Sequence, residues 1–137
     1  RKDLLLLLPV LMLLLGVHGV LAQDTGDILN RINTLRAQRG LPPYSVNGAL
    51  TAAAQQQAQW IVDNGSVVHT HPDGSGPRTR ALANGYGSPD VGENIYGGTM
   101  ATNNDAWIFW LNSPIHYQGM VNTYSKKETD NIFLPFC

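Results

Sequence analysis

The segment from Trp110 to His116 joins the end of one predicted helix to the start of the next, and it constrains the fold more than any other stretch. Ser113 is a favoured helix N-cap, and Pro114 stands at the first helical position, where proline is tolerated. His116 is therefore expected in the first turn of the new helix. Because the positive end of a helix disfavours an imidazolium, the His116 ring should stay neutral and be able to bind a metal or accept a hydrogen bond.

The remaining elements are predicted from periodicity and turn signals. Hydrophobic residues recurring at helical spacing predict three longer helices, over residues 26–39, 48–63 and 103–112. Asp24 or Thr25 is the expected cap of the first of these. Shorter helices are expected to begin at Pro77 and Pro114, and residues 91–96 are predicted to form a strand.

The helix over 103–112 is apolar nearly all round. Ile108 and Phe109 lie outside its main apolar stripe, which predicts burial on two sides. Trp107 and Trp110 are interpreted as core residues rather than as a platform for a ligand.

Length and composition restrict the class of protein. The 137 residues allow one domain, and 43% hydrophobic with 14% charged residues is typical of a globular chain. A net charge of -1 without a basic cluster argues against a nucleic-acid partner. The only cysteine is Cys137, so no intrachain disulfide can form and the fold must rest on its core.

The chain begins with the pattern of a secretory signal. Arg1-Lys2 precedes an apolar run from Leu4 to Leu21, and Val20-Leu21-Ala22 provides a cleavage site before Gln23. We therefore expect residues 1–22 to be a signal peptide, with no stable membrane span after cleavage. The alternative is an uncleaved anchor, because the run is nearly long enough to span a bilayer.

Four motifs then follow one another along the chain: Gly40-Leu41-Pro42-Pro43, His69 to Gly74, Gly92-Glu93-Asn94-Ile95, and Trp110 to Pro114 followed by His116. In this order they resemble the CAP superfamily, also called SCP-like, which holds cysteine-rich secretory proteins, antigen 5 and plant pathogenesis-related proteins. The resemblance is greatest to the cysteine-poor bacterial type and covers roughly Ile28 to Tyr124. It implies one α+β domain over 23–124, a three-layer α/β/α sandwich around a small antiparallel sheet.

The resemblance ends after Tyr124. Family members continue with strands rich in Gly and Val, whereas residues 125–137 form an atypical tail without that pattern. The resemblance thus implies a domain truncated at its C-terminus and an incomplete sheet. We expect the tail to be poorly ordered or wrongly paired.

The resemblance also implies a site. His69 and His116 match the two histidines of a solvent-open family cavity, and Glu93 matches its Gly-Glu-Asn glutamate. A divalent metal such as Zn²⁺ can lie between the histidines, with the carboxylate completing a three-ligand site. Glu93 could instead orient one imidazole from outside the ligand shell, or merely cap a turn.

Several residues depart from the family pattern or leave alternatives open. The family has a second glutamate between the first histidine and the Gly-Glu-Asn motif, but here Arg80 lies near that position, and a cation opposes a metal. Gly119 replaces what is more often asparagine. His71 could pair with His69 as a His-x-His metal clip, although a solvated loop histidine is the preferred interpretation. We therefore expect Zn²⁺ to bind only weakly, through His69 and His116.

The preferred functional hypothesis is a secreted domain, extracellular or periplasmic, that is monomeric and non-catalytic. By resemblance it would bind a lipid or sterol, a small ligand or an extracellular protein. One alternative is a metal-dependent hydrolase or protease with His69 and His116 as ligands and Glu93 as candidate general base. Another is a non-functional truncated remnant. A serine hydrolase is disfavoured, because there is no Gly-x-Ser-x-Gly motif.

Overall fold

The computed structural model describes residues 18–123, with side chains from residue 26 onward. Its five helices are α1 (His18–Ala37), α2 (Gly48–Asn64), α3 (Pro77–Ala83), α4 (Asn103–Asn112) and α5 (Pro114–Met120). The helices predicted over 48–63 and 103–112, and those expected to begin at Pro77 and Pro114, are confirmed. In the part of the chain that is described, no helix combines the length and apolarity needed to cross a bilayer.

Local capping explains where the central helices begin and end. The Asn47 side chain accepts hydrogen bonds from the backbone N–H groups of Ala49 and Leu50, which starts α2. Gly65 ends it in the left-handed region at φ 61°. Thr102 and Asp105 cap each other's backbone N–H groups at the start of α4. These short-range bonds are why the sequence pattern located the helices well.

The first helix differs from its prediction. It begins at His18, eight residues before the expected start, so neither Asp24 nor Thr25 is its cap. Val20, Leu21 and Ala22 continue the helix without a breaking proline. Cleavage before Gln23 would remove the first five residues of α1 and leave most of it in place.

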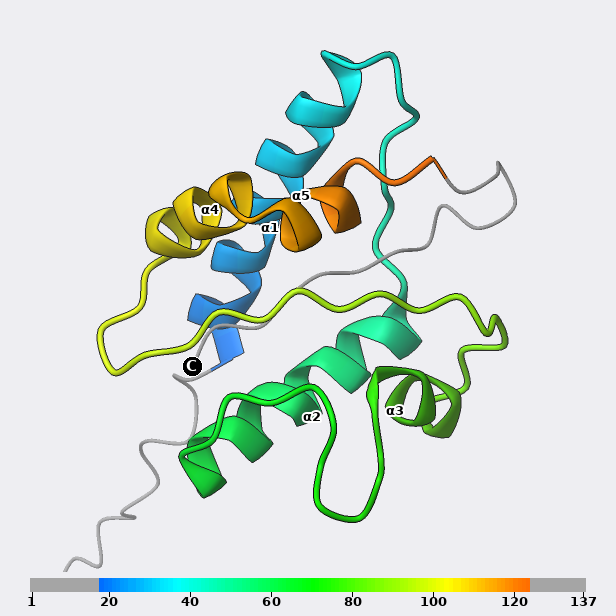
Figure 1. Cartoon of the computed structure of the whole chain (residues 1–137), viewed down its shortest axis with the longest axis vertical. Coiled ribbons are helices and arrows are strands. Elements are labelled where there is room, and N and C mark those ends of the chain that lie inside the picture. The colour runs from blue at the N-terminus through cyan, green and yellow to red at the C-terminus, as the bar shows by residue number, and fades with distance from the viewer. Residues whose placement is uncertain (1–17, 124–137) are drawn as a thin grey trace, which may run out of the picture.

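The chain between α3 and α4 is extended and separates the helices into two groups. Figure 1 shows α4 and α5 on one side of this segment and α2 with α3 on the other, while α1 runs past the segment and its C-terminal part lies beside α4 and α5. The predicted strand at 91–96 is wrong within the described residues, where only Tyr96 makes a bridge. Within the described residues, contacts with α3, α4 and α5 hold the segment, through Arg80, Trp110 and the His116 carbonyl. The expectations for the tail 125–137 concern residues outside the described part.

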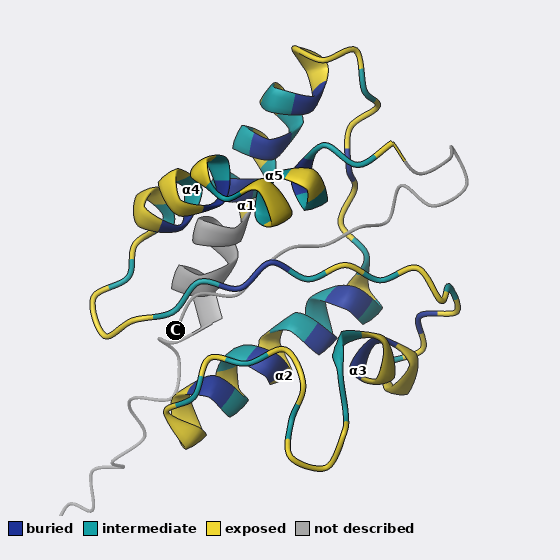
Figure 2. Ribbon diagram, in the orientation of Figure 1, coloured by how far each residue is buried: buried dark blue, intermediate teal, exposed yellow. Residues whose placement is uncertain are grey.

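Each group of helices has its own hydrophobic cluster, visible as the buried positions in Figure 2. The larger cluster joins α1, α4 and α5 through Ile28, Ile32, Tyr44, Ala106, Trp110 and Met120. The smaller one joins α2, α3 and the extended segment through Leu50, Ala81 and Tyr86. Trp110 is 0% exposed and Trp107 packs against the larger cluster, so both are core residues as predicted.

The outer face of α4 is not buried. Ile108 and Phe109 keep 50% and 45% of their surface exposed, so the prediction that α4 is buried on two sides is wrong. Only the face that carries Ala106 and Trp110 turns to the core. Helices α1 and α5 cover one side of α4, and its second apolar side stays in contact with solvent.

A buried arginine connects α1 with the end of α5. The Arg36 side chain is 1% exposed, and its guanidinium lies 3.6 Å from the centre of the Tyr44 ring. Its Nε donates to the Pro42 carbonyl at 2.7 Å, and one terminal nitrogen donates to the carbonyls of Met120 and Asn122 at 3.1 and 3.0 Å. Arg36 lies in the last turn of α1 and links this helix to two other segments. It is therefore a buried connecting residue, unlike an exposed cation at a helix terminus.

Candidate functional site

Glu93 lies at the centre of the candidate site. Its Oε1 accepts a hydrogen bond from His69 Nδ1 at 2.9 Å, and its Oε2 accepts one from an Arg80 terminal nitrogen at 2.7 Å. The Glu93 side chain is only 13% exposed and that of Arg80 only 7%, whereas His69 is half exposed. Both oxygens of the carboxylate are therefore held by protein groups.

Arg80 reaches Glu93 from α3 and holds the preceding loop at the same time. A second terminal nitrogen donates to the backbone carbonyls of His69 and Ser75, at 3.1 and 3.4 Å. Arg80 Nε is buried and makes no hydrogen bond within the described residues. The sequence placed a cation near the missing second glutamate, and the structure shows this cation paired with Glu93.

His116 lies in the first turn of α5, as predicted, but Ser113 acts differently from the expectation. Ser113 occupies the N-cap position, yet its hydroxyl makes no cap hydrogen bond to the helix backbone. Its Oγ lies 2.7 Å from His116 Nδ1. Asn94 donates to the His116 carbonyl at 2.9 Å, and the Phe109 ring lies 5.1 Å from the imidazole. These contacts fix both the backbone and the ring of His116.

The pKa of His116 is lowered from its ordinary value. Burial is the larger cause, because desolvation disfavours the imidazolium, and the charge of His69 adds to it. The structure therefore favours the neutral His116 ring that the sequence predicts. The main cause is burial, whereas the sequence prediction rested on the positive end of the helix.

This shift predicts how stability changes with pH. The unfolded chain takes up a proton on His116 near the usual pKa of 6.5, whereas the folded chain does so only at lower pH. The free energy of unfolding should therefore fall as the pH drops from 6.5 to the folded pKa, and show no further change from this group below it. A histidine NMR titration should give a His116 midpoint below 6.5.

The variant His69→Gln separates the two causes of the shift. It removes the neighbouring charge but not the burial, so the His116 midpoint should rise only part of the way to 6.5. A midpoint at or above 6.5 in the unmodified protein would contradict the predicted environment.

His71 is not the solvated loop histidine that was preferred from the sequence. Its ring stacks on Trp60 with centroids 4.0 Å apart and an angle of 13° between the planes. Its Nε2 lies 2.7 Å from Gln57 Oε1, and its Nδ1 lies 3.2 Å from Ser75 Oγ. Both ring nitrogens are engaged, which argues against a His-x-His metal clip with His69. Gln57 is fully buried, and a glutamine in an amphipathic helix gave no sign of this role.

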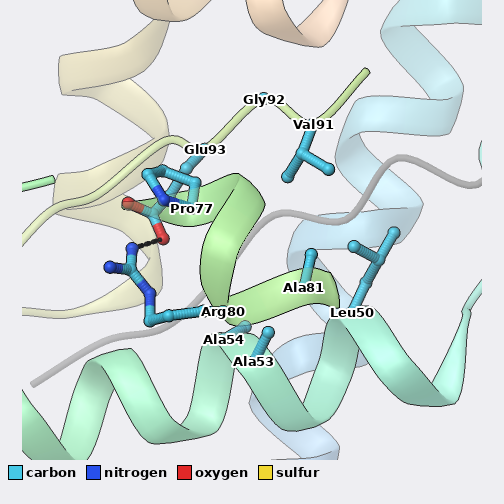
Figure 3. A pocket seen from close by; sticks show the side chains of 9 residues that line it. All are labelled: Leu50, Ala53, Ala54, Pro77, Arg80, Ala81, Val91, Gly92 and Glu93. Carbon is cyan, nitrogen blue, oxygen red and sulfur yellow. Dashed lines mark hydrogen bonds and ion pairs between the residues drawn. The ribbon is translucent and has the colours of Figure 1, made fainter. Parts of the chain in front are cut away.

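A small open pocket with a volume of about 20 Å³ lies beside the Arg80–Glu93 pair. Figure 3 shows the ion pair at one end of it and apolar side chains at the other. Its walls come from α2, α3 and the extended segment, and they consist of Leu50, Ala53, Ala54, Pro77, Arg80, Ala81, Val91, Gly92 and Glu93. Of the three predicted cavity residues, only Glu93 lines this pocket, and neither histidine belongs to its walls.

The described residues do not fit a three-ligand metal site. Among them, no group of three or more histidine, cysteine, aspartate or glutamate side chains could hold an ion. Glu93 is bound to a guanidinium, and its other oxygen orients His69 through Nδ1. That geometry leaves Nε2 of His69 as a possible ligand, with the carboxylate outside the ligand shell. Weak Zn²⁺ binding by His69 and His116 alone stays a prediction.

Gly119 is explained by its neighbour. A Cβ atom at this position would lie 3.0 Å from Asn94 Oδ1, the side chain that also binds the His116 carbonyl. The Asn94 amide therefore fills the space into which a side chain at 119 would point. This contact joins the Gly-Glu-Asn motif to α5. The only feature of the sequence that pointed to it was a glycine within a predicted helix.

Comparison with known proteins agrees with these features. The sequence profile of the cysteine-rich secretory protein family, CAP, matches residues 29–127. Among solved structures, the chain is similar to an outer surface protein from Borrelia burgdorferi, with a TM-score of 0.64 and 22% identity over 80% of this chain and 77% of that one. No curated protein matches the sequence. The structural likeness supports the fold, and the profile covers most of the chain, which therefore belongs to the CAP family of cysteine-rich secretory proteins.

Proposed function

We propose that this CAP domain is a secreted, non-catalytic binding domain for an apolar ligand, such as a lipid or sterol or the apolar face of an extracellular protein. The observation that carries the proposal is the state of Glu93. A general base must accept a proton from substrate or water, but both oxygens of this carboxylate already accept hydrogen bonds from His69 and Arg80. The Arg80 guanidinium and the His69 ring thus stand where a substrate or water would have to approach the Glu93 carboxylate.

Exposed apolar side chains beside His116 support a binding role. Ile108 and Phe109 on α4 are about half exposed, and Ile115 on α5 is 78% exposed. The Phe109 ring contacts both the Tyr96 and the His116 rings. An apolar surface next to a neutral histidine suits a ligand with an apolar body and one polar group.

Binding to vesicles tests the proposal. Vesicles of phosphatidylcholine with cholesterol should retain the protein in a flotation assay. The double variant Phe109→Ser/Ile115→Ser should weaken retention about tenfold or more, since each buried side chain contributes roughly 1.5–3 kcal/mol. Leu82→Ser is the matched control, because Leu82 is 49% exposed on α3, outside this surface.

Two results would count against the proposal. Equal retention of the double variant and of the control would show that the surface beside His116 is not the binding site. Hydrolysis of a peptide or ester substrate in the presence of Zn²⁺, lost in Glu93→Gln, would support the metal-dependent hydrolase instead.

Secretion is proposed from the leader and from the secretory family to which the chain belongs. Protein expressed with residues 1–22 is expected in the periplasm or medium, and N-terminal sequencing should give Gln23 as the first residue. The variant Ala22→Arg, which spoils the small residue before the cleavage point, should leave the leader attached. Recovery of the uncleaved chain in the cytosol would refute the assignment.

A further inference from the structure

We propose that the Arg80 guanidinium is the resident cation of the site, which holds its segments together and keeps a divalent metal from Glu93. The inference concerns how the site is assembled, so it stands independently of any apolar ligand. The family cavity implies a metal, whereas the described residues do not provide three ligands for one.

The contacts of Arg80 converge as ligands do on a metal ion. Its two terminal nitrogens donate to Glu93 Oε2, to the His69 carbonyl and to the Ser75 carbonyl, at 2.7, 3.1 and 3.4 Å. These oxygens come from the extended segment and from the loop between α2 and α3. One cation therefore binds two segments to α3, and no metal is needed to bring them together.

Burial makes this cation hard to replace. The Arg80 side chain is 7% exposed and Glu93 is 13% exposed, so water screens their charges poorly. A divalent ion at Glu93 would have to displace the guanidinium from its carboxylate or lie beside a fixed positive charge. Either requirement weakens metal binding, although His69 already has its Nε2 atom directed away from Glu93.

Reversing the charge at this position should create the missing metal site. Arg80→Glu removes the cation and adds a carboxylate beside His69 and Glu93, which gives three candidate ligands. Isothermal titration with ZnCl₂ should show binding about a hundredfold tighter than in the unmodified protein. Loss of a residue outside the ligand shell already changes metal affinity by up to about a hundredfold, and a new ligand should change it at least as much.

Two control variants separate this explanation from simpler ones. Arg78→Glu makes the same change in net charge at an exposed position of α3 and should leave Zn²⁺ binding unchanged. Arg80→Gln removes the cation without adding a carboxylate, so it should lower the melting temperature and gain little Zn²⁺ affinity. If Arg80→Glu is unfolded without metal, circular dichroism should show refolding as Zn²⁺ is added.

Four outcomes would overturn the proposal. The first is tight Zn²⁺ binding by the unmodified protein that Glu93→Gln abolishes, and the second is an equal Zn²⁺ affinity of Arg80→Glu and Arg78→Glu. The third is an unchanged melting temperature in Arg80→Gln. The fourth is an Arg80→Glu chain that is unfolded without metal and that Zn²⁺ fails to refold. None of these depends on vesicle binding, so failure of the binding proposal and failure of this one can be told apart.

Discussion

Replacing Arg36 with alanine is expected to lower the free energy of unfolding by about 3 kcal/mol or more, because a hydrogen bond from a charged donor contributes roughly 1.5–3 kcal/mol and Arg36 makes several. The change leaves the carbonyls of Pro42, Met120 and Asn122 without the donor that now serves them. It also removes the cation that lies over the Tyr44 ring. Urea denaturation followed by circular dichroism measures the difference.

Arg39→Ala is the matched control for this prediction. Arg39 is exposed, and its guanidinium lies 5.0 Å from the centre of the Tyr117 ring. Its loss should cost about 0.5–1 kcal/mol, as for an exposed cation–π contact. Equal destabilisation by the two substitutions would mean that the hydrogen bonds of Arg36 do not hold α1 to α5.

Trp110→Ala is expected to cost about 3–5 kcal/mol, the range for truncating a large aromatic side chain in a core. Trp110 is fully buried in the larger cluster, and its indole N–H donates to the Ile95 carbonyl at 3.3 Å. Because Ile95 follows Asn94, which holds the His116 carbonyl, the substitution should also shift the NMR signals of the His116 ring. Thermal unfolding and a histidine spectrum measure the two effects.

Trp107→Ala serves as the comparison, since Trp107 is only partly buried against the same cluster. It should cost clearly less and leave the His116 signals near their original positions. A Trp107 variant as unstable as the Trp110 variant would contradict the distinction between the two faces of α4.

The helices were predictable because their signals are local. Asn47, Gly65 and the Thr102–Asp105 pair act within a few residues of the helix ends that they define. The start of α1 was not predictable, because Val20, Leu21 and Ala22 give no stop signal before the start expected at residue 26. The strand at 91–96 failed for the opposite reason, since a ladder depends on a partner that no local pattern specifies.

The sequence suggested which residues to consider for the site, but not the contacts that these residues make. The motif order assigned His69 and Glu93 to one site, and in the structure their side chains are in contact, with Arg80 on the other carboxylate oxygen. It gave no indication that Arg80 would hold Glu93, or that Ser113 would bind His116 instead of the helix backbone. Such contacts depend on how side chains from distant segments meet, and single-residue patterns contain no information about that.

The separation of the two hydrophobic clusters has a consequence for how the molecule opens. Within the described residues, each helix packs mainly inside its own group, α1 with α4 and α5, and α2 with α3. The α2–α3 group has the smaller cluster and is fastened to the extended segment through Tyr86 and the Arg80–Glu93 pair. The α2–α3 group is therefore expected to open locally while α1, α4 and α5 stay folded, and such opening would expose the buried residues Leu50, Ala81 and Tyr86 to solvent.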